Sequence, residues 1–321
     1  MPESKNDRRI CFYHNDLDGH CAGAIVAKNF DWDIELIPIN YNDPFPWDKI
    51  NKETEVWMVD FCLQPFSDMV KLKEECKRLT WIDHHETALN EYQKYTKDKH
   101  SFQGIRSLVL SGCELTYIYF DGRTKHAGWP KDPTEQVDNL AVSLLGRYDV
   151  WKWKDVPNAL EFQFGMRLLE THPGKEKGRE LWKILLGSQR ASERCIDKIV
   201  EEGRVVLRYR EQQNKKQALG SCFQVEMNGH KFIVANVGYT NSQFFDSVID
   251  KFPEAVGVMS FHYRKKCWNI SLYEIKGREC PDMGELAVMY GGGGHKGAAG
   301  FQVPNKSMRI MPFRLPFNYG L

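Results

Sequence analysis

The feature that most constrains this chain is a set of short apolar runs that each lead into a histidine or an aspartate. The three cases are ICFY (10–13) before His14, VWMV (56–59) before Asp60, and LTWI (79–82) before Asp83. Each run has about the length of a β-strand and is rich in β-branched or aromatic residues. Helical patterns at 20–30 and 66–79 follow two of the runs, and 34–39 is typical of a further strand. This alternation predicts a parallel sheet in an α/β fold.

The rest of the chain differs from this start. Helical patterns dominate up to residue 187, and 191–217 has the charged helical pattern of an element that bridges domains. Beyond it lie strand pairs, one with Asn228-Gly229 as its turn and one with Arg264-Lys265-Lys266, and helical patterns at 241–252 and 282–290. We expect three parts: a parallel-sheet catalytic domain at 1–190, a long linker helix at 191–219, and a smaller α/β domain with a mixed sheet at 220–321.

The strand ends carry side-chain types that bind metals. Ligands of open parallel sheets collect at the carboxyl ends of the strands, so the three runs point these groups into one crevice. HNDLDG (14–19) adds Asp16 and Asp18, which an extended segment would turn to the same side as His14. So many acidic and imidazole groups would repel one another without cations, and two divalent ions remove that difficulty.

The mixture of ligands also predicts which metals bind and what they do. Imidazole together with carboxylate suits manganese, iron or cobalt better than magnesium, which prefers oxygen ligands alone. Two such ions about 3.5–4 Å apart can activate water and clamp both oxygens of an in-line displacement at phosphorus. The strand ends therefore favour a metal-assisted reaction of a phosphate ester.

Each motif taken singly also has a structural interpretation. HNDLDG can be an Asx-type turn that caps the following helix, and Asp60 alone can be a cap or turn residue. Asp83-His84-His85 can be a structural ion pair. Asp149, in GRYD at the end of a helical pattern, is by itself typical of a C-terminal turn. We favour a metal site over these structural interpretations, because acidic and imidazole side chains recur at three strand ends.

Composition limits the partners. A net charge of +1 leaves no uniformly basic face for long duplex, so a nucleotide partner should be short. The nine cysteines are scattered without a C-x-x-C, which fits a reducing compartment and argues against a disulfide framework or a structural zinc site. The N-terminus is polar, and no apolar stretch approaches the roughly 20 residues of a membrane span. We expect a cytoplasmic protein with no membrane partner.

The order and spacing of the motifs resemble the DHH phosphoesterase superfamily with its DHH-associated C-terminal domain. The matching residues are HNDLDG, the isolated Asp60, IDHHE (82–86) and Asp149 in GRYDVW. RSLVLSGCELTY (106–117) is similar to the helix start after the DHH motif in oligoribonuclease members, the short-oligonucleotide or nano-RNase type. The resemblance implies an active site in a cleft between the two domains.

The resemblance also implies residue roles. One metal would be held by His14, Asp16 and Asp60, and the other by Asp18, Asp60, His84 and Asp149, with Asp60 shared. The H-x-D-x-D spacing is shorter than in many relatives, which leaves the role of His14 less defined. On the strand rule, His85 should face away from His84 and meet the substrate phosphate as a catalytic group. Asp83 would orient one of the two rings.

A glycine-rich segment, GGGGHKGAAG (291–300), offers backbone N–H groups with no side chains in the way, although by itself it is equally typical of a flexible loop. It resembles the GGGH…AAGF signature of the C-terminal domain of the superfamily. That likeness implies substrate contacts from Gly292, Gly293, Gly294 and His295, with Arg106 as a further phosphate contact. Many relatives have arginine where this chain has Tyr273.

These observations lead to an expected function. It is a manganese-dependent phosphodiesterase, an exonuclease that hydrolyses short oligonucleotides, RNA above DNA, to mononucleotides with two divalent ions. A cyclic dinucleotide or a nucleoside 3′,5′-bisphosphate would use the same metals, and a nucleotide- or DNA-binding protein without catalysis is the alternative from another class. The sequence leaves open whether the chain forms a homodimer.

Overall fold

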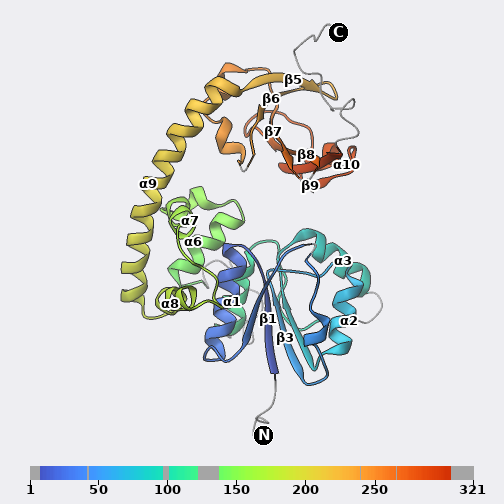
Figure 1. Cartoon of the computed structure of the whole chain (residues 1–321), viewed down its shortest axis with the longest axis vertical. Helices are drawn as coiled ribbons and strands as arrows, with labels where there is room; N and C mark the ends of the chain where they lie inside the picture. The colour runs from blue at the N-terminus through green and yellow to red at the C-terminus, as the bar shows by residue number, and fades with distance from the viewer. Residues whose placement is uncertain are drawn as a thin grey trace. The chain divides into compact units, whose positions relative to one another are not determined.

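The computed structural model describes residues 8–41, 43–96, 101–121, 137–238, 240–264 and 266–304. The chain divides into two compact units, Met1–Leu207 and Arg208–Leu321, and the division falls within helix α9 (Gln189–Ser221). Figure 1 labels the elements of both units. The expected α/β class is confirmed, with a parallel sheet in the first unit and a mixed sheet in the second.

The sheet of the first unit has four parallel strands in the order β2-β1-β3-β4. They are β1 (Arg8–His14), β2 (Glu35–Ile39), β3 (Thr54–Val59) and β4 (Arg78–Ile82). Tyr13 on β1 lies opposite Val59 on β3, and Val59 lies opposite Ile82 on β4. The carboxyl ends of these three strands are therefore level with one another at one edge of the sheet.

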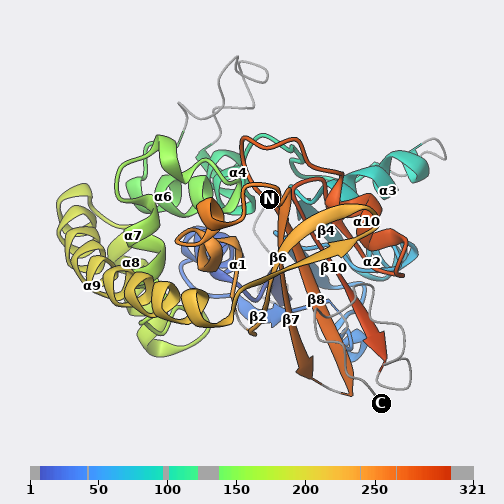
Figure 2. The ribbon, with the colours of Figure 1, turned by 90° about the horizontal axis from the view of Figure 1, so that it is seen from above.

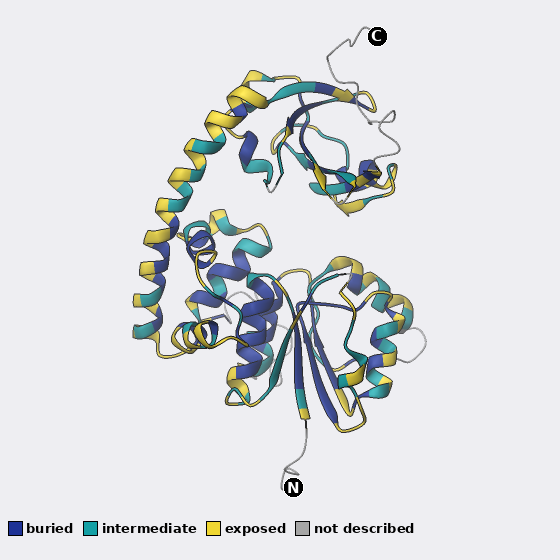
Figure 3. Cartoon of the chain, in the orientation of Figure 1, coloured by how far each residue is buried: buried dark blue, intermediate teal, exposed yellow. Residues whose placement is uncertain are grey.

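Both faces of this sheet are buried, which explains why its strands read as continuous apolar runs. Alternate side chains enter two separate cores: Cys11 and Tyr13 pack in one, while Ile10 and Phe12 pack in the other. Strands β1, β3 and β4 are dark blue, the colour of buried residues, over most of their length in Figure 3.

Helices cover both faces of the sheet (Figure 1). The first core is closed by α1 (Leu17–Asn29), α4 (Gly112–Asp121), α6 (Leu140–Asp149), α7 (Ala159–Met166) and α8 (Glu176–Leu185). The second core is closed by α2 (Ser67–Glu75) and α3 (Glu86–Thr96). Two short 3₁₀ turns, η1 (Trp47–Lys49) and η3 (Trp153–Asp155), complete the described elements of this unit.

The long polar helix α9 has 33 residues and extends the predicted 191–217 at both ends. Its first half packs in the first core through Ile196, Ile199 and Val200. A methyl group at Gly203 would lie 1.8 Å from the carbonyl oxygen of Glu161 on α7, so only glycine permits this close crossing. In the described part of the chain, no helix is long and apolar enough to cross a membrane.

The second unit contains a six-stranded sheet in the order β5-β6-β7-β8-β10-β9. Its strands are β5 (Phe223–Met227), β6 (His230–Asn236), β7 (Gly257–Arg264), β8 (Cys267–Glu274), β9 (Gly293–His295) and β10 (Ala298–Pro304). Only the β6–β7 pair is parallel among these neighbours. Figure 2 shows β7 and β8 as long neighbouring arrows in this sheet.

Both predicted strand pairs form hairpins. Asn228 and Gly229 have φ angles of 51° and 77°, as a type I′ turn requires. Arg264 pairs with Cys267, so the basic run forms the tip of the β7–β8 hairpin, and its Lys265 lies outside the described residues. Helix α10 (Met283–Val288) matches the pattern predicted at 282–290.

The helix predicted at 241–252 is wrong. The segment forms two 3₁₀ turns, η4 (Ser242–Phe245) and η5 (Ile249–Lys251). The guanidinium of Arg278 donates hydrogen bonds to the carbonyls of Ile249, Phe252 and Ala255, and Pro253 has no N–H with which to extend a helix. Carbonyl groups at this end of the predicted helix are thus hydrogen-bonded to a distant side chain.

Candidate metal centre

The three strand ends place their polar side chains together, as predicted. His14 is the last residue of β1, Asp60 follows β3 directly, and Asp83 follows β4 directly. The structure brings His14, Asp60 and residues close to these strand ends into three overlapping sets, and the ligand atoms of each set lie within 4.8 Å of one another. The sets are His14–Asp16–Asp60, Asp18–His84–Asp149, and Asp60–His84–His85.

HNDLDG forms a turn between β1 and α1 rather than an extended segment, so the expected strand alternation is wrong here. Asp16 is the N-cap of α1, and its Oδ1 accepts a hydrogen bond of 2.9 Å from the N–H of Gly19. Its Oδ2 lies 2.9 Å from Nδ1 of His14. A methyl group at Gly19 would lie 2.1 Å from the carbonyl oxygen of His14. Asp16 therefore caps the helix with one oxygen and belongs to the cluster with the other.

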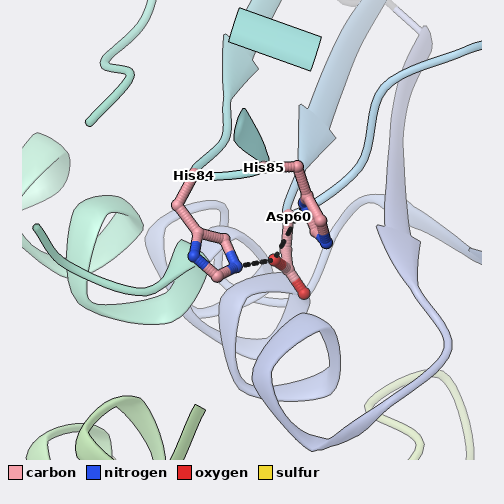
Figure 4. Close-up of side chains that lie close together, drawn as sticks. All are labelled: Asp60, His84 and His85. Atoms are coloured by element: carbon pink, nitrogen blue, oxygen red, sulfur yellow. Dashed lines mark ion pairs between the residues drawn. The ribbon is translucent and has the colours of Figure 1, made fainter. Parts of the chain in front are cut away.

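Asp60 occupies the middle of the cluster. Its Oδ1 lies 3.2 Å from Nε2 of His84, and its Oδ2 lies 3.8 Å from Nδ1 of His14. Figure 4 shows its carboxylate between the two neighbouring histidines of the DHH motif. Asp60 has a left-handed backbone, with φ of 55°, which costs a non-glycine residue about 1 kcal/mol and is typical of functional sites.

The histidines of the DHH motif both turn toward Asp60, so the expectation that His85 faces away from His84 is wrong (Figure 4). Oδ1 of Asp83 accepts hydrogen bonds from the backbone N–H of His84 and of His85, which bends the chain directly after β4. The alternation of a strand does not extend through such an Asx turn. The same oxygen lies 2.7 Å from Nδ1 of His85, so Asp83 orients that ring.

Asp149 reaches the cluster from a different element. It is the last residue of α6, and its Oδ2 lies 3.3 Å from Nε2 of His84. Asp18, in the first turn of α1, lies 3.8 Å from the same nitrogen. The residue set that the resemblance implies for one metal is thus assembled around His84.

The electrostatics of the cluster are unfavourable without cations. Burial raises the pKa of Asp60 well above its usual value, and the charges of Asp18, Asp16 and Asp149 raise it further. The pKa of Asp149 is raised by burial and by the charges of Asp18 and Asp16. Asp16 is the exception: burial opposes its ionisation, but its contacts with His14 and Gly19 lower its pKa to about 2.

The buried atoms of the cluster fit divalent cations. Both carboxylate oxygens of Asp60 are buried and have no hydrogen-bond partner among the described residues. A buried carboxylate without donors is strongly disfavoured, and its stable alternatives are protonation or metal coordination. Asp60 shares two of the three ligand sets, so a cation in each set would satisfy one of its oxygens.

His85 differs electrostatically from His84. Burial lowers the pKa of His84. Burial also acts to lower the pKa of His85, but the hydrogen bond and charge of Asp83, with the charges of Asp149 and Asp18, raise it to about 9. The motif therefore pairs an imidazole that favours its neutral form, suited to a metal, with one that keeps its proton.

Arg106 is held away from a phosphate role by its own contacts. Its guanidinium donates to the backbone carbonyls of Trp81 and Phe102, at 2.8 and 2.9 Å, and lies over the rings of Trp81 and Tyr92. These contacts fasten the segment after α3 to β4. A phosphate contact from Arg106 stays a prediction.

Two residues near the cluster were missed by the sequence analysis. The ring of Tyr41, just past β2, lies 5.7 Å from that of His14 and 6.2 Å from that of His85. His20 holds the HNDLDG turn, because its Nε2 lies 3.0 Å from Oδ1 of Asn15. Tyr41 could have been found from the sequence, because it closely follows the strand expected at 34–39, and that strand (β2) also ends at this edge of the sheet.

The glycine-rich segment is not a loop. Gly293–His295 and Ala298–Pro304 pair as β9 and β10, and a methyl group at Gly294 would lie 2.5 Å from the Cα of Ala299. The N–H groups of Gly291 and Gly292 donate to carbonyls of α10, so the expected run of free donors is wrong at these two positions. Gly293, Gly294 and His295 are exposed. Their role in substrate binding stays a prediction.

Sequence likeness to known proteins is weak. No family model matches the chain. A curated relative, an uncharacterized protein of Acanthamoeba polyphaga mimivirus, is 25% identical over 226 residues, which cover 68% of this chain. The chain spans 46% of that relative, about half of its length.

The solved structures are more informative about the fold. The DHH domain of a protein described as belonging to a family of ribosomal proteins is 13% identical, with a TM-score of 0.59, and the match covers 94% of this chain and 84% of that one. This chain has the fold of a DHH-domain protein.

Two further solved structures have similar coverage of this chain and lower TM-scores. A pGpG-specific phosphodiesterase from Vibrio cholerae is 17% identical, with a TM-score of 0.47 over 94% of this chain and 95% of that one. RecJ from Thermus thermophilus in complex with Mn²⁺ is 14% identical, with a TM-score of 0.47 over 94% of this chain and 50% of that one. The assignment of the fold depends on the DHH domain with the TM-score of 0.59.

Proposed function

We propose that the chain is a metal-dependent phosphodiesterase of the DHH superfamily that hydrolyses short oligonucleotides, RNA above DNA, to mononucleotides. The observation that carries this proposal is Asp60, a buried carboxylate in two ligand sets with neither oxygen hydrogen-bonded among the described residues. A fold stabilised for its own sake would not bury such a group. Shared carboxylates of this kind are typical of two-metal hydrolysis at phosphorus.

The residues assign two metal positions. His14, Asp16 and Asp60 would hold one ion. Asp18, His84 and Asp149 would hold the other, together with Asp60, whose Oδ1 lies 3.2 Å from Nε2 of His84. When bound, two divalent ions, with manganese favoured by the mixed ligands, supply Lewis acidity that activates water and neutralises phosphoryl oxygens. Asp60 keeps the two positions adjacent because one side chain serves both.

His85 and Asp83 act on the substrate in this proposal. The hydrogen bond with Asp83 holds the His85 ring in place, and the charge of Asp83 favours a protonated imidazole. A protonated imidazole beside the scissile phosphate donates a hydrogen bond to a phosphoryl oxygen and can protonate the leaving oxygen. Asp83, with no exposed surface, serves as the group that orients this donor.

The preference for short substrates depends on charge. The net charge of +1 provides no extended basic track of the kind that long-strand binders use. Contacts from Gly292, Gly293, Gly294 and His295 in the second unit complete the proposal. Neither long duplex DNA nor a membrane is proposed as a partner, and a homodimer stays open. Cytoplasmic location belongs to the same proposal.

One experiment separates the substrate classes. The purified protein with Mn²⁺ is incubated with an RNA dinucleotide, a longer RNA, a cyclic dinucleotide and a nucleoside 3′,5′-bisphosphate in parallel. We expect the dinucleotide to be cleaved fastest. Faster cleavage of the cyclic dinucleotide or the bisphosphate would move the assignment to that class, and intact substrates that nevertheless bind would identify a non-catalytic nucleotide-binding protein.

A further inference from the structure

The start of helix α4 lies directly on the cluster. The backbone N–H groups of Gly112 and Cys113 donate to Oδ2 and Oδ1 of Asp18, at 2.7 and 3.0 Å. A methyl group at Gly112 would lie 2.5 Å from Cβ of Asp60. The position of α4 therefore decides where both oxygens of Asp18 lie.

Glu114 fixes the first turn of this helix. Its Oε2 accepts a hydrogen bond of 3.0 Å from the N–H of Ser111, while Oγ of Ser111 accepts from the N–H of Glu114 at 3.4 Å. This reciprocal pair is a capping box. Glu114 has no exposed surface, so its charge requires a partner inside the protein.

That partner comes from the helix that carries Asp149. Nη2 of Arg147, on α6, lies 3.0 Å from Oε1 of Glu114, and Arg147 is only 7% exposed. Gly146 lets the two helices approach, since a methyl group there would lie 2.4 Å from the carboxyl carbon of Glu114. The pair thus connects α4, whose first N–H groups donate to Asp18, with α6, which ends at Asp149.

A buried ion pair is a weak way to stabilise a fold. The loss of hydration of two buried charges offsets most of their attraction, and apolar side chains of similar size often serve equally well. The ion pair between Glu114 and Arg147 does give α4 and α6 one defined spacing. The two residues thereby spaced, Asp18 and Asp149, both contact Nε2 of His84, at 3.8 and 3.3 Å.

We propose that Glu114 and Arg147 are positioning residues that set the distance between Asp18 and Asp149, and thereby the affinity of the metal position formed with His84. We expect the position formed by His14, Asp16 and Asp60 to depend on them less, because two of its three ligands lie at the end of β1 and in the turn that follows it. The proposal depends on the two-ion centre of the proposed function. It adds that different parts of the fold set the metal affinity of the two positions.

The test is a titration of the metal-free protein with Mn²⁺, followed by calorimetry and by electron paramagnetic resonance. Wild-type protein should show two binding events. Asp149→Asn and Asp16→Asn identify which event belongs to which position. Glu114→Gln keeps an oxygen for the capping bond and removes the ion pair, so it should weaken the Asp149 event by about tenfold or more and leave the other unchanged.

The chain offers a matched control. Glu55 contacts Arg78 at the same 3.0 Å, at the amino end of the sheet, with 10% of its side chain exposed. Glu55→Gln should lower thermal stability without changing either Mn²⁺ event. If Glu114→Gln does not fold, Arg147→Lys makes the same test, because it keeps the charge and loses the reach of the guanidinium.

The outcomes are distinguishable. Wild-type affinity at both positions in Glu114→Gln or Arg147→Lys, or equal weakening of both events, would overturn the positioning role and leave the proposed function standing. Fewer than two events in the wild-type protein would overturn the two-ion centre and the positioning role together.

Discussion

The two edges of the four-stranded sheet differ in how their acidic side chains are paired. At the amino edge, Glu35 contacts Arg8 and Lys49 at 2.7 and 2.6 Å. Glu55 there contacts Arg78 at 3.0 Å and Arg9 at 3.6 Å. At the carboxyl edge, Asp18, Asp60 and Asp149 gather around His84 with no lysine or arginine in contact with them among the described residues.

This difference shows which charges serve the fold. Glu35 and Glu55 at the amino edge each have two basic partners, so their charges are balanced without any added ion. The carboxyl edge has excess acid, a strained Asp60 and two buried oxygens with no donor among the described residues. Unfavourable charges and backbone strain that are confined to one edge of a regular sheet indicate a binding site at that edge.

The largest expected effect is on turnover. Asp60→Ala should lower the rate by at least about a thousandfold, because both ions lose a shared ligand and transition-state stabilisation of several kcal/mol disappears. Glu55→Gln, at the other edge, should keep the wild-type rate. Steady-state rates with the best substrate of the parallel assay measure both. An active Asp60→Ala variant would contradict the shared-ligand assignment.

The next effect is on stability with and without metal. Saturating Mn²⁺ at about a hundredfold its dissociation constant should stabilise the folded protein by about 2.7 kcal/mol for each independent site. Thermal unfolding, with and without a chelator, measures this shift. In Asp60→Asn the shift should nearly vanish, whereas in Glu55→Gln it should equal that of the wild type. Equal shifts in the two variants would remove the contrast between the edges.

Without metal, Asp60→Asn should be more stable than the wild type at about pH 8, by about 1–3 kcal/mol, because it removes an unpaired buried charge. A carboxyl whose pKa is raised on folding binds protons more tightly in the folded state, so wild-type stability rises as the pH falls from that raised pKa toward the pKa of the unfolded chain. The advantage of the variant should therefore shrink between about pH 8 and about pH 5. Chemical denaturation at several pH values measures it, and a constant difference across that range would show that the pKa of Asp60 is not raised on folding.

The smallest effect concerns the amino edge. Glu55→Gln should lower the free energy of unfolding by about 1–2 kcal/mol, because it leaves Arg9 and Arg78 without their carboxylate. Chemical denaturation measures this loss. A larger loss that depends on Mn²⁺ would mean that the two edges are coupled through the sheet.

The strand ends could be predicted from sequence because each apolar run reports a buried strand and the next residue then lies at its edge. The same reasoning failed where side chains bend the backbone. The Asx turn at Asp83 reverses the expected direction of His85, and Asp16 caps a helix where an extended segment was expected. Local hydrogen bonds of this kind override the strand period.

Other features depend on tertiary contacts that no short pattern encodes. Asp149 was recognised only through the resemblance, because a helix end looks the same whether or not it meets a metal cluster. Backbone carbonyls that bind the guanidinium of Arg106 come from residues up to 25 positions away. The glycine-rich segment looked like a loop, since sequence does not distinguish glycines that give flexibility from glycines that let two strands approach.

Gly112 contributes no ligand atom, yet its place at the start of α4, against the side chain of Asp60, restricts which residues this position can hold. Any side chain at this position must displace either the helix or the central carboxylate. Homologous chains that retain all six acids and histidines but carry a larger residue in place of this glycine are therefore expected to have lost the centre, and a survey based on ligands alone would misclassify them.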